Sequence, residues 1–263
     1  MENIPKKLII KECIKVMKPL KTKSFTYYFT DTKVRKGNFT QLAPQIFVED
    51  GAKLQFKPIS LRAAAYTVFN QTFNCTLSMT YPLLITKDHI VSYFTPSYLH
   101  CAIPSDFKNS KSDICCLAHE FTHAEIYFRL RNRIPSWLNE GFATQNQASS
   151  FYENEMDTLR NKKECLKDLF PPKTGSYNVN YLLVKNFLKQ NKTNFASFFS
   201  SNGDFLSKFF EFGGVEALNL TLNHFGYKIY DEDVKKYLLN KLGSRYRKYI
   251  NPFIDDLEKQ AKK

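Results

Sequence analysis

Two features are missing from this chain of 263 residues, and each absence excludes a class of protein. No stretch approaches the roughly 18 consecutive apolar residues that a membrane-spanning helix needs, so we expect no membrane span. The segment from Met1 to Leu20 holds no uninterrupted apolar run, because charged residues between Lys11 and Lys18 interrupt it. This is not the pattern of a secretory signal peptide, so we expect a soluble, cytoplasmic protein, with export by another route left open.

A cysteine framework is also missing. The six cysteines lack the spacing of a small disulfide-rich secreted domain, and no C-x-x-C pair occurs anywhere in the chain. Thiolates are good zinc ligands, and Cys115 and Cys116 lie one turn or less before His119. Because they have no C-x-x-C partner, we interpret them as buried free thiols rather than as metal ligands.

Acidic residues are few relative to basic ones. The chain has 38 Lys and Arg against 25 Asp and Glu, a formal net charge of +13. A charge of this size fits a nucleic acid or another acidic partner only where the cations cluster. Here they are scattered in short groups such as 33–36, 129–133 and 245–248. We therefore expect a generally basic solvated surface and no specific nucleic-acid partner.

Residues 1 to about 110 show the patterns of strands. Aromatic and β-branched residues, bounded by turn signals such as Glu49-Asp-Gly51, predict short strands at 24–30, 45–48, 81–86, 90–95 and 98–103. Leu61 to Phe69 is the one convincing helix in this part, with Pro58 and Ser60 where a helix start is expected. We therefore expect a small sheet with mixed elements in the N-terminal part.

From about residue 111 onward the patterns are helical. Apolar spacing predicts a helix from Ile114 to about Arg131, capped by Ser110 or Ser112, and a second helix with Ser136 as its N-cap. The apolar face of the first helix is expected to contain Ile114, Leu117, Ala118, Phe121, Ala124 and Phe128. Further helices are expected at 177–190, 194–201, 204–211, 214–224, 232–241 and 246–261, with a phenylalanine stripe that we interpret as core packing.

These patterns predict an α+β fold. A β-rich part with a small sheet and helices spans 1–110, and a helical part that carries the candidate site spans 111–263. The chain contains no internal repeats and no low-complexity linker. The two parts are therefore expected to pack together as one compact unit around the helices of the motif.

His119 and His123 stand four residues apart in the sequence His119-Glu120-Phe-Thr-His123 of the first predicted helix. Four residues are close to one turn, so both imidazoles leave the same face about 6 Å apart along the axis, and one zinc ion can bridge them. Glu120 lies about 100° round the helix, where its carboxylate reaches a water on the metal rather than the metal itself. The motif predicts a zinc site with Glu120 as general base.

Glu140 falls in the first turn of the second predicted helix, seventeen residues after His123. A glutamate three or four residues after a serine cap is common for capping and dipole reasons without any metal. Gly141 and Ala143 favour a metal ligand, because small residues allow a second backbone to approach closely, as a metal shared between two helices requires. On the residues alone both interpretations stay open.

The two motifs together, His119-Glu120-Phe-Thr-His123 and then Trp-Leu-Asn-Glu140-Gly-Phe-Ala, resemble those of the gluzincin zinc metallopeptidases. The likeness is greatest to the peptidase MA-like proteins and covers about residues 115–190. It implies a zincin-like catalytic unit with zinc held by His119, His123 and Glu140. It also implies that Glu120 acts as general base and then as general acid.

The resemblance extends more weakly to Tyr177 and Tyr181. In many gluzincins a tyrosine from this region donates a hydrogen bond to the oxyanion, although a tyrosine at helical spacing is more often half-buried packing. Two departures are visible. The amine-binding motif of M1-type aminopeptidases is absent, and Thr144 stands where thermolysin-like enzymes carry an aspartate that orients a zinc-bound histidine. The group that orients that histidine must therefore come from elsewhere.

The resemblance implies a zinc-dependent metallopeptidase, an endopeptidase, that cleaves a polypeptide by Glu-assisted attack of a zinc-bound water. The alternative is a zinc-binding interaction protein that retains a gluzincin site without proteolysis, which the unmatched flanks and the missing aspartate favour. A nucleic-acid-associated protein is a third hypothesis, indicated by charge alone. The oligomeric state and the natural substrate stay open.

Overall fold

The computed structural model describes residues 22–30, 33–88, 90, 92–95, 99–131, 134–147, 177–190, 195–199, 204–243 and 247–261. The chain separates into two compact units. The first comprises Met1–Ile59 with Thr80–Lys108, and the second comprises Ser60–Met79 with Asn109–Lys263. Residues 60–79 follow predicted strands in the sequence but group with the helical part, because Phe69 and Phe73 belong to its hydrophobic core.

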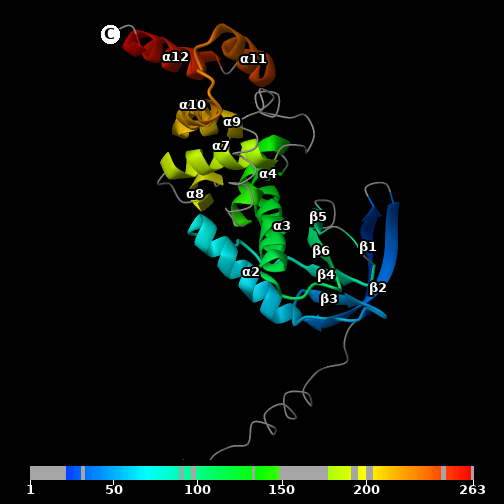
Figure 1. Cartoon of the computed structure of the whole chain (residues 1–263). Helices are drawn as coiled ribbons and strands as arrows, with labels where there is room; N and C mark the ends of the chain where they lie inside the picture. Colours follow the sequence, from blue (N-terminus) through cyan, green and yellow to red (C-terminus); the bar gives the residue numbers. More distant parts are fainter. Residues whose placement is uncertain are drawn as a thin grey trace, which may run out of the picture. The chain divides into compact units, whose positions relative to one another are not determined.

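The first unit contains a six-stranded sheet with the order β1-β2-β3-β4-β6-β5 (Figure 1). Its strands are β1 (Thr22–Thr30), β2 (Lys33–Ala43), β3 (Ile46–Glu49), β4 (Leu83–Thr86), β5 (Tyr93–Thr95) and β6 (His100–Pro104). The β3–β4 and β4–β6 pairs are parallel, whereas the other three pairs are antiparallel. The prediction of a small N-terminal sheet, and with it the α+β fold class, is confirmed.

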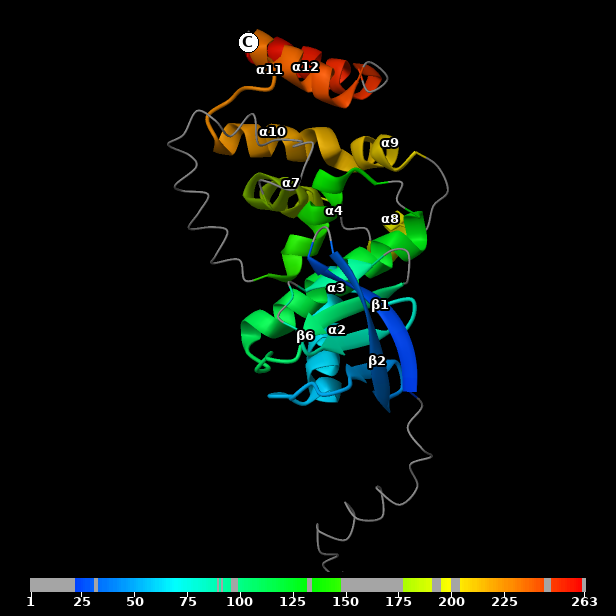
Figure 2. The same cartoon turned by 90° about the vertical axis from the view of Figure 1, so that its right-hand side faces the viewer.

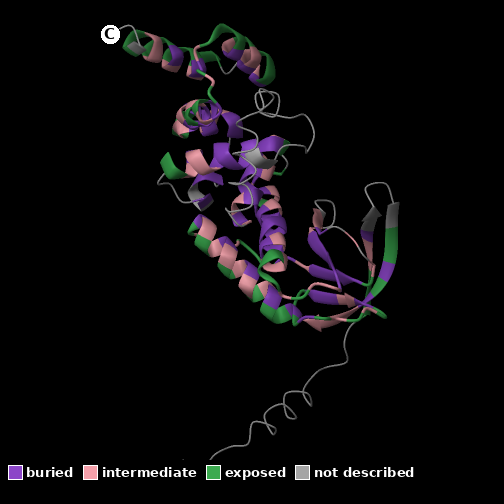
Figure 3. Cartoon of the chain, viewed as in Figure 1, coloured by how far each residue is buried: buried purple, intermediate pink, exposed green. Residues whose placement is uncertain are grey.

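The two central parallel strands, β4 and β6, are buried at every position (Figure 3). Strands buried on both faces have continuous apolar sequences, and this made them predictable from the sequence. β2 was not predicted, because charged residues and Gly37 interrupt its apolar pattern. The structure explains the glycine: a Cβ atom at Gly37 would lie 2.7 Å from Oε1 of the buried Glu49.

The second unit is helical among its described residues. Its helices are α2 (Pro58–Phe73), α3 (Lys111–Leu130), α4 (Ser136–Ala143), the 3₁₀ turn η1 (Thr144–Asn146), α7 (Tyr177–Gln190), α8 (Phe195–Phe199), α9 (Phe205–Phe209), the π-helical turn η2 (Phe210–Gly214), α10 (Val215–His224), α11 (Glu232–Leu242) and α12 (Arg247–Ala261). These bounds confirm the predicted helices to within a few residues. None of the described helices is long and apolar enough to cross a membrane.

Phenylalanines dominate the core of the second unit. Phe195, Phe198, Phe199, Phe205, Phe209 and Phe210 are all buried in one hydrophobic cluster with α7 and α10. The rings of Phe199 and Phe205 are stacked with centroids 5.1 Å apart. The interpretation of this stripe as core packing is confirmed. The cysteine interpretation holds for Cys115, which is a buried thiol, while the thiol of Cys116 is half-buried, and neither forms a disulfide.

α3 carries its own start and stop signals. Ser110 Oγ accepts a hydrogen bond from the Asp113 N–H at 3.1 Å, and the Asp113 carboxylate accepts one from the Ser110 N–H at 3.0 Å. This is a capping box, and it identifies Ser110 as the cap. At the other end Arg131 adopts a left-handed conformation with φ 49°. Phe128 was wrongly placed on the apolar face: it is 36% exposed and lies beside the Arg131 guanidinium.

α4 has only 8 residues and no side-chain cap. Its N-cap is Pro135, so the prediction of Ser136 in that role was wrong. Pro135 already holds the extended conformation that an N-cap requires, with φ −58° and ψ 141°. Isolated helices shorter than about 12 residues are marginal in water, so α4 depends on the elements packed against it. Figures 1 and 2 show α7 running beside it.

Candidate metal centre

Three side chains from two helices of the second unit converge on one point. His119 and His123 come from α3, and their Nε2 atoms are 3.0 Å apart. Oε2 of Glu140, in α4, lies 3.4 Å from each of these two nitrogens. These are the three residues that the sequence pattern and the resemblance indicate as metal ligands, and among the described residues they form a compact His-His-Glu cluster compatible with metal binding.

The triangle of donor atoms fits a tetrahedral metal ion. Zinc binds histidine nitrogen and carboxylate oxygen at about 2.0–2.1 Å, so tetrahedral ligands are about 3.3 Å from one another. The observed separations of 3.0, 3.4 and 3.4 Å match this value. In addition, Glu140 Oε2 is buried and makes no hydrogen bond among the described residues. A buried carboxylate oxygen without such a bond is costly, and a bound cation would satisfy it.

Without a metal ion, the cluster retains a proton. Burial by itself would lower the pKa of His123, but the adjacent carboxylates of Glu140 and then Glu120 raise it to about 9. Burial lowers the pKa of His119, which stays neutral beside its charged neighbour. Burial would raise the pKa of Glu140, yet its contacts with the two histidines lower it to about 2. One histidinium and one carboxylate therefore face each other in the metal-free chain.

Asn139 orients the second histidine. Its side-chain carbonyl oxygen lies 3.0 Å from Nδ1 of His123, so Nδ1 carries the proton and donates. Nε2 is then the nitrogen that faces Glu140 with its lone pair available for a metal when the ring is neutral. Asn139 was not identified from the sequence. Its position directly before Glu140 was the available signal, because consecutive residues on a short helix reach neighbouring parts of one site.

Thr144 does not replace the missing aspartate. Its hydroxyl donates within its own helix, to the carbonyl oxygens of Glu140 at 2.8 Å and Gly141 at 3.1 Å. Nδ1 of His119 is buried and makes no hydrogen bond to a side chain among the described residues, while burial lowers the pKa of His119 and the nearby Ala143 carbonyl acts to raise it. The two histidines therefore differ, because Asn139 orients His123 through a side-chain hydrogen bond, whereas His119 has the backbone carbonyl of Ala143 beside it.

Glu120 is buried with 6% exposure, next to His119 on α3. Its charge contributes to the raised pKa of His123, so it lies near the cluster without belonging to it. The side chain of Tyr177 lies outside the described residues. Tyr181 is 4% exposed within the hydrophobic core, and the Lys185 ammonium is 5.5 Å from its ring centroid. Its role in the site therefore stays a prediction.

Gly141 lets α7 approach α4. A Cβ atom there would lie 2.7 Å from Val184 Cγ2 and 2.8 Å from the carbonyl oxygen of Asn180, both in α7. From the sequence, this glycine was expected to allow the close approach of two backbones that share a metal. The structure shows a different neighbour: the close approach is to α7, which supplies none of the three ligands.

α3 is anchored on its other side by Glu125, which is fully buried. Its carboxylate accepts hydrogen bonds from the Ser78 N–H at 2.9 Å and hydroxyl at 2.6 Å, and from Arg129 Nε at 2.6 Å. Arg129 also donates to the Ser78 hydroxyl at 2.7 Å. A carboxylate satisfied in this way is a fixed structural element. The charged end of α3, noted in the sequence as basic, is thus tied into the fold through Arg129.

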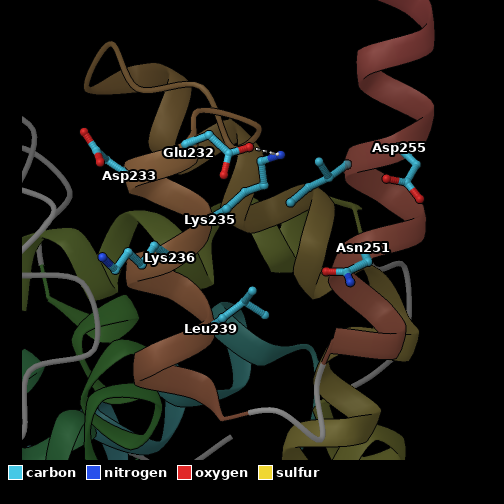
Figure 4. Close-up of a pocket in the computed structure, with 8 residues that line it drawn as sticks. Glu232, Asp233, Lys235, Lys236, Leu239, Asn251 and Asp255 are labelled. Atoms are coloured by element: carbon cyan, nitrogen blue, oxygen red, sulfur yellow. Dashed lines mark ion pairs between the residues drawn. The ribbon is translucent and has the colours of Figure 1, made fainter.

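A separate cavity of about 480 Å³ lies between α11 and α12 (Figure 4). Its lining mixes both signs of charge, including Lys235, Lys236, Glu232 and Asp255. The Lys235 ammonium is paired with Glu232 at 2.8 Å and with Glu258 at 2.9 Å. Because these pairs neutralise the cation and none of the three candidate ligands lines the cavity, it is not part of the candidate centre.

No protein-family model matches the chain, and no curated protein matches it in sequence. Two solved structures match: a mutant of a two-domain M1 zinc metallopeptidase bound to L-arginine, and a mutant M1 zinc metallopeptidase from Deinococcus radiodurans. Identities are 14% and 11%, both TM-scores are 0.35, and each match covers 90% of this chain but 52% of the other. The chain spans about half the length of these proteins. Similarity this low shows nothing about the residues of the site.

Proposed function

We propose that this chain is a zinc-dependent metallopeptidase that hydrolyses peptide bonds as an endopeptidase. The observation that carries the proposal is the triangle of donor atoms from His119, His123 and Glu140, whose sides match the ligand spacing of tetrahedral zinc. Three protein ligands leave a fourth position open, which is the arrangement of catalytic rather than structural zinc sites. Zinc bound there would lower the pKa of water and polarise a carbonyl group.

The remaining chemistry belongs to residues of the chain. Glu120 is buried beside the cluster and is the candidate base: its carboxylate takes a proton from the attacking water and later delivers it to the leaving amine. Asn139 holds the His123 ring in the orientation that directs Nε2 to the centre. Tyr177 or Tyr181, from α7, would donate a hydrogen bond to the oxyanion. The substrate would be an extended polypeptide.

A second function, zinc binding without proteolysis, is favoured by one observation. Nδ1 of His119 makes no hydrogen bond to a side chain among the described residues, and Thr144 directs its hydroxyl into its own helix instead. A histidine that lacks an orienting side chain makes a weaker ligand, commonly by tenfold or more in metal affinity. A non-catalytic protein would tolerate such a loss more easily than an enzyme.

The two functions are separated by digesting a broad peptide library with zinc-loaded protein, with and without a chelator. The proposed peptidase cleaves peptides, the chelator stops the cleavage, and zinc restores it. Glu120→Gln should keep stoichiometric zinc and lose cleavage by at least about a hundredfold, as expected for removal of a general base. Glu216→Gln, in α10, is the matched control and should cleave like the parent.

Two results would reject the peptidase. If Glu120→Gln cleaves as fast as the parent, the assigned mechanism is wrong. If the parent binds zinc but leaves every peptide intact, the non-proteolytic function takes its place. Metal analysis of the purified chain comes first, because absence of stoichiometric zinc with all three ligands intact would remove the basis for both functions.

A further inference from the structure

The ligand that α4 contributes depends on how that helix is fixed to its neighbours. Three consecutive residues after α4, Thr144, Gln145 and Asn146, satisfy carbonyl groups at the end of the helix. Gln145 Nε2 also donates to the Tyr181 carbonyl in α7 at 2.9 Å. Asn146 makes the corresponding link to α3, the helix with the two histidines.

The link to α3 is a hydrogen bond between two buried side chains. Asn146 is 3% exposed and Thr122 is fully buried. Asn146 Nδ2 donates one hydrogen to Thr122 Oγ1 at 2.7 Å and the other to the Ala143 carbonyl at 3.0 Å. The Thr122 hydroxyl donates to the Ala118 carbonyl at 3.0 Å, so it can only accept from Asn146. Each hydrogen that the Asn146 amide and the Thr122 hydroxyl donate therefore has an assigned acceptor.

The position of this bond relative to the ligands is what gives it a role. Thr122 directly precedes His123 in α3, and Ala143 is three residues after Glu140 in α4. A shift of the Asn146 amide would change the distance between the last turn of α4 and the turn of α3 that holds the histidines. The donor-atom triangle, with sides of 3.0 to 3.4 Å, tolerates little change before one ligand is lost.

We propose that Asn146 and Thr122 are positioning residues of the metal centre, and that their hydrogen bond sets the spacing between Glu140 and the two histidines. This inference rests on the metal centre in the proposed function but not on peptide cleavage. Thr122, within the motif, and Asn146, at the end of α4, would thereby increase the affinity of the centre for the metal. Neither residue belongs to the His-His-Glu cluster.

A second Asn–Thr hydrogen bond of the same kind occurs among the described residues, away from the centre, and supplies a matched control. In α10 the Thr221 hydroxyl donates to the Ala217 carbonyl at 2.7 Å, and Asn186 Nδ2 from α7 donates to Thr221 Oγ1 at 3.1 Å. Both pairs join an Asn amide to a Thr that is bonded back to an Ala carbonyl four residues earlier. Of these two pairs, only Asn146–Thr122 joins the end of one ligand-bearing helix, α4, to the other, α3.

The test measures zinc dissociation constants by competition with a chromophoric chelator, and urea unfolding of the metal-free chain, for both pairs. Thr122→Val and Asn146→Ala should each weaken zinc binding about tenfold. The double variant should be no weaker than either single variant, because both remove one shared bond. Thr122→Ser keeps the hydroxyl and should bind zinc like the parent. The visible spectrum of the cobalt-substituted protein should change in Thr122→Val and not in Thr122→Ser.

The control variants Thr221→Val and Asn186→Ala should also lower stability but bind zinc within about twofold of the parent. The inference is overturned if the Thr122 and Asn146 variants keep parental affinity, or if the control pair loses as much. It is also overturned if the parent binds no zinc. A parent that binds zinc and cleaves no peptide rejects the peptidase alone, so the two failures are distinguishable.

Discussion

The two helices that supply the ligands are built in opposite ways. α3 has 20 residues, a capping box at Ser110 and a left-handed stop at Arg131. α4 has 8 residues, no side-chain cap, and end groups satisfied by residues that also reach α3 and α7. α3 is thus specified largely by its own sequence, whereas α4 exists because other elements hold it. The two histidines are positioned by a helix that its local sequence specifies, whereas the third ligand, Glu140, is positioned by tertiary contacts.

The largest expected effect concerns the charge pair that joins the helices in the metal-free chain. The pKa of His123 is about 9, above its unfolded value of 6.5, because Glu140 is adjacent. The stabilisation is fully present below pH 6.5 and is lost between pH 6.5 and 9 as the folded-state proton leaves. We expect the free energy of unfolding of the chelator-treated chain to fall by up to about 3 kcal/mol across this window.

Urea unfolding at pH 6, 7, 8 and 9 measures this loss. Glu140→Gln removes the anion that holds the proton, so its stability should vary much less over the same pH range. Equal pH dependence in the parent and in this variant would show that the Glu140 charge does not tie α4 to α3.

A smaller effect is expected at the contact between α4 and α7. Gly141→Ala would gain up to about 1 kcal/mol on helix propensity alone. The added Cβ would instead meet Val184 and the Asn180 carbonyl at under 3 Å, so we expect a net loss of about 2 kcal/mol. Chemical denaturation gives the sign. Adding Val184→Ala should not restore stability, because the backbone oxygen of Asn180 remains; a stabilised Gly141→Ala would contradict the close approach.

The smallest effect is expected where α3 is self-sufficient. Ser110→Ala removes one half of the capping box and should lower the free energy of unfolding by about 1 kcal/mol. Zinc affinity should stay within about twofold of the parent, because the histidines lie two turns or more from that end and Glu125 holds the helix elsewhere. A tenfold loss of zinc affinity in this variant would mean that α3 is no more autonomous than α4.

The contrast explains what could be predicted from the sequence. The helix of the motif, the helices from α7 to α12 and the buried strands β4 and β6 follow from periodicity, caps and continuous apolar runs. β2 was missed because charged residues and Gly37 interrupt its apolar pattern, and the glycine is explained by side chains that only the folded sheet brings close, those of Glu49 and Phe39. The start of α4 was displaced by one residue because Ser136 looks like a cap in sequence, while Pro135 has the cap conformation.

The same limit applies to the candidate centre. His119, His123 and Glu140 were identified from spacing and resemblance, and the structure brings their donor atoms together. Asn139 and Asn146 were missed because each contacts a partner at least sixteen residues away in the sequence. Polar residues of this kind have no periodicity, so only a folded chain shows which hydrogen bond each one makes.

The close contact at Gly141 and the two hydrogen bonds of the Gln145 amide affect how α4 and α7 can move. α4 carries the carboxylate of the candidate metal centre, and α7 carries both tyrosines considered for the oxyanion. The two backbones are in close contact at Gly141, and the Gln145 amide donates to the Gly141 and Tyr181 carbonyls, so we expect α4 and α7 to move together. If α7 contacts the substrate as proposed, a change in its position would therefore also change the position of the Glu140 carboxylate.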